Sequence, residues 1–382
     1  MKRLYVDFHV IQTVPPSCVN RDDTGRPKTA IYGGVNRARV SSQSWKHEMR
    51  KMFTEIFHEE QLGKRTLHAV RLIKNYLEQD GIEEEQANEM AKKALEKAGI
   101  TVNSKNKTEV MFFISNVQAK ELAELIKNEG IQAESETNND VKEKKAKKSK
   151  KDKEKKADSK YQDILKVSQS IDIALFGRMV AKPEDLSIDA ASQVAHSIST
   201  HAVQSEYDYF TAVDDLSNSS GAGHLGTKEF NSATLYRYAT VNVLDLFKTL
   251  KLGIKEELFE AVKADTANCI KGFAEAFICS MPTGSQNSYA NRTLPDLVYV
   301  TVRTDQPVNL SGAFEMPIKS KEGYAEKSVE ALSKYAKKIY DDYCGTPAHS
   351  FVIGSDSFPE AEKVNLSGLL EQLYNYISNG VI

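Results

Sequence analysis

The sequence is short of cysteine, has no long apolar run and carries almost no net charge, and each shortage excludes a class of protein. Its four cysteines, Cys18, Cys269, Cys279 and Cys344, stand far apart without a C-x-x-C pair, which argues against a disulfide framework. Nowhere do about 18 apolar residues follow one another, as a membrane-spanning helix requires, and the first residues lack the layout of a signal peptide. We therefore expect a soluble, cytoplasmic protein with reduced thiols and no membrane contact.

The charge balance excludes a protein that is basic overall. Lysine and arginine number 51 against 53 aspartates and glutamates, so the formal net charge is −2. A site for a polyanion must therefore be a local patch. The 382 residues, 40% of them hydrophobic, are enough for a large core and about two or three structural units.

One such patch is "GGVNRARVSSQSWKHEMR", residues 33–50. Its basic side chains are Arg37, Arg39, Lys46 and Arg50, and its small donors are Ser41, Ser42, Gln43 and Ser44. Free backbone N–H groups and the positive end of the helix dipole meet these donors where a helix starts, an arrangement that suits phosphate. The two glycines allow a backbone to approach closely. The alternative is an ordinary amphipathic helix with a serine cap and solvated lysines.

Hydrophobic periodicity predicts alternating strands and helices. Residues 4–11 alternate as a strand with one face on a core, and residues 15–34 are rich in turn residues and read as a loop. A helix is expected to begin near Ser42–Ser44. Further helices are expected within 66–130, at 257–280 and at 323–343, and further strands at 232–246 and 296–303. This order is that of an α+β fold with a ferredoxin-like, or RNA-recognition-motif, core and large insertions.

The stretch of about 134–160 differs in composition from the rest. Between Lys142 and Lys160 there are 11 lysines and 4 acidic residues, a local charge of +7. With no apolar anchors it cannot offset its ordering entropy, so we expect disorder. It is either a solvated insertion loop or a non-specific contact to nucleic acid.

Several motifs, in order, resemble one family. These are "PSCVNRDDTGRPKTAIYGGVNRARVSSQSWKHEMRK", "DIALFGRM", "AHSISTH", "YFTAVDD", "AGHLGTKEF" and "YRYATVNV". They are similar to the CasC family, the repeated backbone subunit of the type I-E CRISPR surveillance complex, Cascade. The resemblance covers most of residues 4–55 and 170–243 and is weaker towards the end.

The resemblance implies a hand-shaped α+β fold and a scaffold function in antiviral defence. The implied parts are a palm (1–58 and 234–382), helical fingers that include the lysine-rich insert (59–190) and a thumb hairpin (200–233). Several copies, about six, would stack head to tail along the guide RNA (crRNA) beside other Cascade subunits. Each thumb would displace one nucleotide, so the guide is displayed in segments for pairing with target DNA. No catalytic residue, metal or cofactor is implied.

The resemblance also carries over residue by residue. In the palm it implies RNA contacts by Lys28, Arg39, Ser41, Gln43, Lys46 and Arg50, mostly to guide phosphates. Met179 would pack beside a kinked base, with Arg178 near the RNA backbone. In the thumb, Phe210, His224 and Leu225 would lie against the RNA, with Tyr209 as a less certain contact. Apolar wedges stack on any base, which suits a guide of variable sequence. The alternative for Phe210 and Leu225 is burial in a small local core.

Other constellations point to different chemistry. The pair Asp214–Asp215 resembles the thumb aspartate of related backbone subunits with metal-dependent RNase activity, but adjacent acids are also common in solvated turns. His196 and His201, five residues apart, do not suit a metal pair on one helix face, and we expect both to be packing or capping residues. Cys18 is expected to be structural, with Asn20 and Arg21 supporting the RNA-facing loop. A third possibility is a single-stranded RNA binder that works alone.

Overall fold

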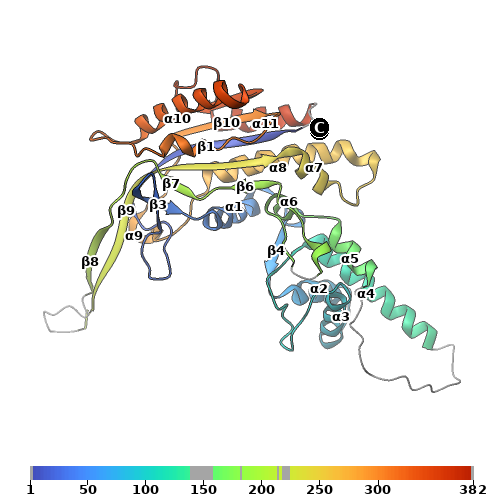
Figure 1. The fold of residues 1–382 in the computed structure, drawn as a ribbon. Helices are drawn as coiled ribbons and strands as arrows, with labels where there is room; N and C mark the ends of the chain where they lie inside the picture. The colour runs from blue at the N-terminus through green and yellow to red at the C-terminus, as the bar shows by residue number, and fades with distance from the viewer. Residues whose placement is uncertain (1–2, 138–157, 181–182, 213–214, 217–223, 380–382) are drawn as a thin grey trace. The chain divides into compact units, whose positions relative to one another are not determined.

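The computed structural model describes residues 3–137, 158–180, 183–212, 215–216 and 224–379 (Figure 1). These residues form two compact units. Unit 1 comprises residues 1–53, 192–244 and 267–382, and unit 2 comprises residues 54–191 and 245–266, in each case as far as they are described. None of the described helices is long and apolar enough to cross a membrane. The fold class is mixed α+β, as predicted.

Unit 1 is built on one large sheet with β1 and β9 at its centre. The strand order is β12-β11-β10-β1-β9-β7-β3-β2, and β6 and β8 also pair with β9. Only the pairing of β11 with β12 is parallel among these described strands. The strands are β1 (Tyr5–Ser17), β2 (Thr29–Tyr32), β3 (Val35–Val40), β6 (Ser192–Val194), β7 (Ser197–Ser199), β8 (Glu206–Ala212), β9 (His224–Asn242), β10 (Leu297–Arg303), β11 (His349–Ile353) and β12 (Glu362–Lys363).

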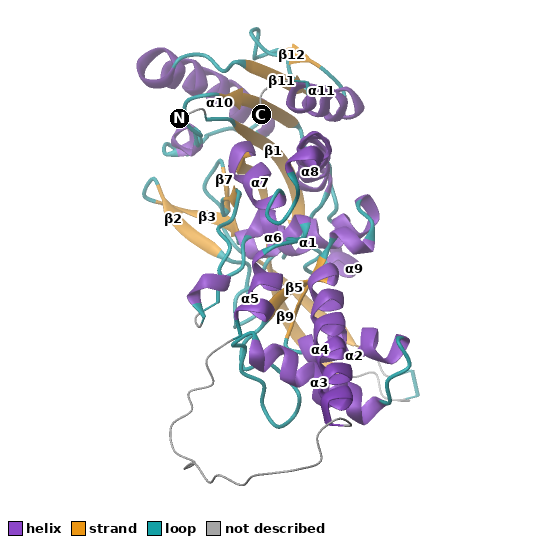
Figure 2. Ribbon diagram, turned by 90° about the vertical axis from the view of Figure 1, so that its right-hand side faces the viewer, coloured by secondary structure: helices purple, strands orange, loops and turns teal. Residues whose placement is uncertain are grey.

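Helices lie along both faces of this sheet (Figures 1 and 2). They are α1 (Ser42–Ile56), α8 (Phe259–Cys279), α9 (Gln286–Tyr289), α10 (Ala325–Ile339) and α11 (Leu366–Ser378). On one face Phe8 of β1 contacts Phe273 and Phe277 of α8, with ring centroids 5.5 Å and 6.0 Å apart. On the other face α10 packs on tyrosines of β9 and β10. β1 is therefore buried on both faces, whereas the sequence predicted one.

The face under α10 contains buried polar groups. Asp7 is fully buried, and its carboxylate accepts hydrogen bonds from the backbone N–H of Val308 at 2.8 Å and the hydroxyl of Tyr238 at 3.2 Å. Burial raises the pKa of Asp7 to about 6. His9, two residues along, bonds to the Tyr236 hydroxyl through Nδ1 at 2.8 Å, and burial lowers its pKa to about 3. Desolvation favours the uncharged form of both groups.

Strand β8 and the first half of β9 leave the sheet as a two-stranded ribbon (Figure 1). Their register runs from Glu206 opposite Phe230 to Ala212 opposite His224. Every residue of β8 is exposed, and among the described residues the pair packs on another element only near its base, where Tyr289 of α9 lies 5.9 Å from Phe230 between ring centroids. The ribbon lies within residues 200–233, the range that the resemblance assigns to the thumb hairpin.

Unit 2 is mainly helical, with a two-stranded sheet of β4 (Gly63–Thr66) and β5 (Phe112–Ser115). Its helices are α2 (Ala69–Gln79), α3 (Glu84–Lys97), α4 (Asn116–Thr137), α5 (Ser159–Lys166), α6 (Ile171–Phe176) and most of α7 (Val243–Leu250). Apolar stripes of α2 and α3, including Ile73, Leu77 and Leu95, form its core. Short 3-10 helices of unit 2 occur at Glu59–Gln61, Glu184–Leu186 and Glu256–Leu258.

Unit 1 has a 3-10 helix at Ser311–Phe314 and a short π-helix at Tyr340–Cys344, directly after α10.

The predicted helices and strands are present, with four differences. The strand predicted at 232–246 ends at Asn242, and α7 begins at Val243. Residues 15–34 are not only loop, because they contain the end of β1 and all of β2. Helix α4 extends to Thr137 and α5 begins at Ser159, inside the segment predicted as disordered, while 138–157 lie outside the described residues. Residues 245–266 belong to unit 2 and not to the predicted palm. There Leu252 accepts a hydrogen bond from the Ser168 N–H at 3.4 Å, and Gly253 packs on Val167.

Candidate nucleic-acid interface

Asn20 holds the predicted phosphate-binding segments together in unit 1. Its side-chain oxygen accepts a hydrogen bond from the Ser41 N–H at 2.9 Å, and its carbonyl accepts one from the Lys28 N–H at 2.8 Å. The Lys28 carbonyl in turn accepts from the Arg39 N–H at 2.9 Å. One loop residue therefore brings Lys28, Arg39 and the start of α1 to the same place.

Lys28 and Arg39 form a locally uncompensated positive patch. Both are half-buried, and neither takes part in an ion pair with a described carboxylate. The Arg39 guanidinium donates to the Thr29 carbonyl at 3.1 Å and to His196 Nδ1 at 3.1 Å. Two positive charges without a counter-charge suit an anionic ligand.

Helix α1 contributes its first turn and one side. Ser41 is buried just before the helix, Gln43 is exposed, and Lys46 and Arg50 are half-buried beside the stripe of Trp45, Met49 and Phe53. No acidic residue stands in the first turn of α1, so its dipole end remains available to an anion. Burial lowers the pKa of Lys46. Both Lys46 and Arg50 also interact with other residues of the protein.

Arg37 and Gly33 do not belong to the anion site that the sequence suggested. Arg37 is fully buried and donates to the carbonyls of Ser199 at 2.8 Å and Phe314 at 2.7 Å. Weaker bonds reach Tyr32 at 3.1 Å and Glu315 at 3.3 Å. A Cβ on Gly33 would lie 1.7 Å from the Glu315 carbonyl oxygen. The backbone that approaches this glycine is the protein's own.

The ribbon exposes apolar side chains on both faces. Phe210 is 41% exposed and Leu225 is 55% exposed, so neither is buried in a local core. Phe210 stands opposite Gly226 and Leu225 opposite Thr211. Since successive strand residues point to opposite faces, Phe210 and Leu225 lie on opposite faces of the ribbon.

Each face of the ribbon has further ring side chains, of which His224 and Tyr209 were predicted and Tyr207 was not. His224 lies on the Phe210 face, with the two ring centroids 6.0 Å apart. Tyr207 and Tyr209, 66% and 65% exposed, lie on the Leu225 face. Each face of the ribbon thus exposes aromatic or apolar side chains, next to the charged Glu206, Asp208 and Lys228 on the Phe210 face and Glu229 on the other.

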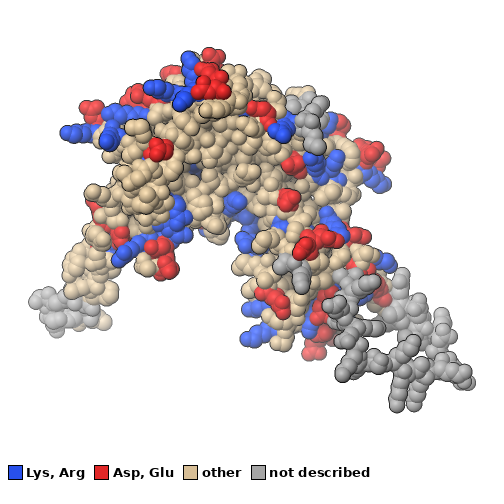
Figure 3. All heavy atoms as spheres, in the orientation of Figure 1, with Lys and Arg blue, Asp and Glu red and all other residues tan. Residues whose placement is uncertain are grey.

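Where the ribbon joins the sheet, basic side chains gather beside a few carboxylates (Figure 3). Arg26 pairs with Glu229 at 3.3 Å. The Lys228 ammonium lies over the ring of Tyr289 in α9, 5.4 Å from its centroid. The loop of Lys28 is therefore close to the base of the ribbon, and both belong to unit 1.

In unit 2 the two adjacent predicted residues have opposite environments. Met179 is 92% exposed, as a contact to a ligand requires. Arg178 is 3% exposed, and its guanidinium donates to the carbonyls of Leu186 at 2.8 Å and Leu165 at 2.5 Å. Burial lowers the pKa of Arg178 to about 10. Its side chain ties α5 to the 184–188 segment, so a guanidinium contact to RNA does not fit this structure.

The remaining candidate residues also divide into buried and exposed side chains. His201 is buried and accepts from the Thr234 N–H at 3.1 Å, and Cys18 is buried with a raised thiol pKa, as packing roles predict. His196, in contrast, is exposed beside Arg39; no sequence signal distinguished it from His201. Asp215 is exposed, and Asp214 lies outside the described residues. Among the described residues no three His, Cys, Asp or Glu side chains gather as metal ligands.

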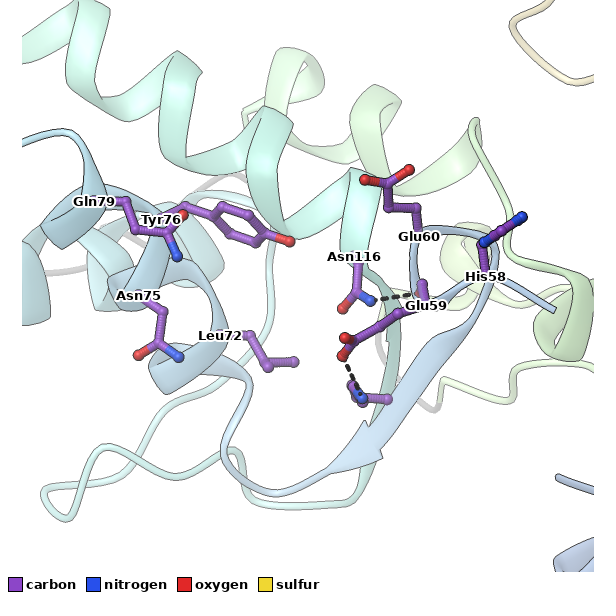
Figure 4. Close-up of a pocket in the computed structure, with 9 residues that line it drawn as sticks. His58, Glu59, Glu60, Leu72, Asn75, Tyr76, Gln79 and Asn116 are labelled. Carbon is purple, nitrogen blue, oxygen red and sulfur yellow. Dashed lines mark hydrogen bonds and ion pairs between the residues drawn. The ribbon is translucent and has the colours of Figure 1, made fainter. Parts of the chain in front are cut away.

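A separate pocket of about 480 Å³ opens in unit 2 (Figure 4). It is lined by His58, Glu59, Glu60, Lys64, Leu72, Asn75, Tyr76, Gln79 and Asn116. Glu59 pairs with Lys64 at 2.9 Å, and the Asn116 amide donates to the Glu59 carbonyl at 2.8 Å. None of the predicted RNA-binding residues lines this pocket, and its two carboxylates do not suit a phosphate.

Comparisons with known proteins agree over nearly the whole chain. The family model described as "CT1975-like protein" matches residues 6–376. A chain of a solved "CRISPR RNA-guided surveillance complex, pre-nicking" is 28% identical with a TM-score of 0.79, and the match covers 98% of this chain and 100% of that one. A chain of a "CRISPR RNA-guided surveillance complex" shares the fold at 24% identity and a TM-score of 0.58, covering 96% and 99%. No curated protein sequence matches the chain.

Proposed function

This chain belongs to the family of CT1975-like proteins, and we propose that it is a subunit of a CRISPR RNA-guided surveillance complex. The support is a match that extends over 98% of this chain and 100% of a chain from such a complex. A match over both full lengths favours a shared role for the whole chain over a shared domain. The sequence motifs extend the proposal to the CasC subunit of a type I-E Cascade.

In this role the chain is a non-catalytic backbone subunit with an RNA-recognition-motif palm. Several copies, about six, polymerise along one crRNA together with other Cascade subunits. The guide is displayed in short segments, and base pairing with target DNA then supplies the sequence specificity. Antiviral defence in the cytoplasm is the biological setting of this proposal.

One observation carries the RNA-binding part of the proposal. The same unit contains Lys28 and Arg39, which form no ion pair with a described carboxylate, near the base of a ribbon that exposes an apolar side chain on each face. The cations and the start of α1 hold phosphates, which fixes the position of the strand without reading its sequence. A ribbon inserted between two nucleotides touches one base with Phe210 and the other with Leu225. Stacking of this kind tolerates any base.

Copurification tests membership in the complex. When the chain is expressed with a CRISPR array and neighbouring genes, we expect short RNAs of uniform length and several partner proteins in fixed ratio. A general single-stranded RNA binder would instead bring down RNAs of mixed length without partners.

Charge reversal tests the phosphate site. The double variant Lys46→Glu/Arg50→Glu should bind RNA at least about tenfold more weakly and with a smaller salt dependence, because phosphate contacts release counterions. The matched control is Lys334→Glu/Lys338→Glu, an exposed i, i+4 pair on α10. Equal losses in both variants would show a non-specific charge effect and contradict the site.

The competing function is a backbone subunit that cuts RNA with a metal ion held by Asp214 or Asp215. A scaffold needs no metal-activated water, so Asp214→Ala/Asp215→Ala should leave guide integrity and target binding unchanged. If the wild-type complex cuts complementary RNA with Mg²⁺ and the variant does not, the enzymatic function replaces ours.

A further inference from the structure

His196 lies beside the two unpaired cations of the candidate phosphate site. It stands between β6 and β7, is exposed, and its Nδ1 is 3.1 Å from Arg39 Nη1. The charged groups that act on it are Arg39 of β3 and Lys28 just before β2, and both are positive. No described carboxylate acts on it to offset them.

The contact with Arg39 fixes the protonation state of this imidazole. A guanidinium can only donate hydrogen bonds, so His196 Nδ1 must accept and carries no proton. The ring is therefore neutral, and its proton sits on Nε2, on the ring edge opposite Arg39. Burial, together with the charges of Arg39 and Lys28, lowers the pKa of His196 below its ordinary value.

We propose that His196 is a third ligand of the phosphate group that Lys28 and Arg39 hold, and that it takes up a proton when RNA binds. This rests on the proposed function, since the ligand is a phosphate of single-stranded RNA. A phosphate between the three side chains accepts a hydrogen bond from Nε2–H and adds a negative charge near the ring. That charge offsets the repulsion by the two cations, so the imidazolium becomes favourable only in the complex. The added proton goes onto Nδ1, so the Arg39 guanidinium releases this nitrogen and donates to the phosphate instead.

Proton uptake makes RNA affinity depend on pH with a defined sign. The bound state has the higher pKa, so affinity rises as the pH falls below it. The rise is at most about tenfold per pH unit for one proton. It ends once the pH is below the pKa of the free protein, which lies under the ordinary histidine value of about 6.5.

The test compares pH profiles of RNA binding. Affinity of the full-length chain for a labelled short oligouridine is measured at constant ionic strength, from about pH 7.5 to about pH 5.5. We expect wild type and the control His68→Gln, an exposed histidine of unit 2, to gain affinity on acidification. His196→Gln should bind somewhat more weakly than wild type at about pH 7.5, because it removes the Nε2–H ligand, and should gain at least severalfold less affinity on acidification. In parallel, ¹³C-histidine NMR should show the His196 pKa rising when the oligouridine is added.

The outcomes separate this inference from the proposed function. If Lys28→Ala/Arg39→Ala binds RNA as tightly as wild type, the phosphate site is wrong, and the inference fails with it. If that variant binds weakly but the profiles of wild type and His196→Gln have the same slope, only the inference is overturned. His224 on the ribbon is a second histidine in the candidate interface, so the difference between these two slopes is the quantity that decides.

Discussion

The sheet of unit 1 and the ribbon that leaves it each contain side chains in unusual environments, buried polar groups in the sheet and exposed apolar groups in the ribbon. The sheet buries charged and polar groups such as Asp7, His9 and Arg37, whereas the ribbon exposes Phe210 and Leu225. Both regions share one strand, β9, whose first half lies in the ribbon and whose second half pairs with β1. The difference therefore arises from packing partners and not from strand chemistry.

This contrast shows which unusual residues are structural and which point to a ligand. A buried charge is tolerated only when hydrogen bonds replace its water, and Arg37 has four carbonyl acceptors from three separate segments. A contiguous patch of exposed apolar side chains marks a binding surface, whereas a single one does not, and the ribbon has such a patch in Tyr207, Tyr209 and Leu225. In unit 2 the hydrogen bonds of buried Arg178 likewise show a structural residue, while Met179 is exposed.

Of the substitutions that test this comparison, replacing the buried Arg37 should lower the stability of the fold the most. Arg37→Met leaves the carbonyls of Ser199 and Phe314 without their donor, so we expect a loss of about 3–5 kcal/mol in the free energy of unfolding. Urea unfolding measures it. The matched variant Arg39→Met, two residues along the same strand, should change stability by less than about 1 kcal/mol but weaken RNA binding. Similar stabilities for the two variants would refute the structural role of Arg37.

Gly33 and Gly34 provide a second pair with unequal surroundings. Both have positive φ, of +58° and +76°, but only Gly33 faces the Glu315 carbonyl; nothing lies within 4 Å of a Cβ on Gly34. Gly34→Ala should cost about 1 kcal/mol of stability for the left-handed backbone alone. Gly33→Ala should cost about 1–3 kcal/mol more, because the backbone at Glu315 must move away from the new Cβ. Equal melting temperatures of the two variants would show that this contact is not tight.

Substitutions on the ribbon test whether its exposed apolar side chains bind RNA and do not stabilise the fold. Phe210→Ala/Leu225→Ala should leave the melting temperature of the RNA-free protein unchanged, because neither side chain supports a core. Loss of base stacking should weaken RNA binding by about 1–3 kcal/mol for each base, equally for guides of different sequence. Each single variant should lose part of this RNA-binding free energy, since the two residues lie on opposite faces. A large drop in melting temperature with unchanged RNA affinity would contradict the wedge role.

The local elements of this fold were largely predictable from the sequence. The alternation at residues 4–11 and the spacing of Trp45, Met49 and Phe53 are local patterns, and β1 and α1 follow them. Strand β2 was missed although its partner is local, because the turn-rich composition of residues 15–34 obscured a short hairpin. Residues Thr29–Tyr32 pair with β3 across the two-residue turn of Gly33 and Gly34.

The site was less predictable, because the sequence does not show which face of a strand is covered. Arg37 and Arg39 have the same chemistry and the same orientation on β3. Arg37 is structural because the carbonyls of Ser199, Tyr32 and residues 314–315 surround its guanidinium. His196 was interpreted as a packing residue because its contact with Arg39 joins positions 157 residues apart. Position in the tertiary structure, and not residue type, decides these roles.

The last effect that we expect comes from the two buried titratable groups of β1, and it sharpens the account of the sheet. Asp7 has a pKa of about 6 in the folded protein against an ordinary 3.8, so its contribution to stability is present at low pH and is lost as the pH rises through about 6. His9 has a pKa of about 3 against 6.5, so its contribution is present above 6.5 and is lost as the pH falls towards about 3. Between about pH 4 and 6 the two slopes oppose each other, each at most about 1.4 kcal/mol per pH unit.

Relative to wild type, Asp7→Asn should therefore lose stability on acidification across this window, and His9→Gln should gain it. Melting temperatures at a series of pH values measure both differences. Two variants whose curves run parallel to that of wild type would show that these groups do not titrate inside the folded sheet.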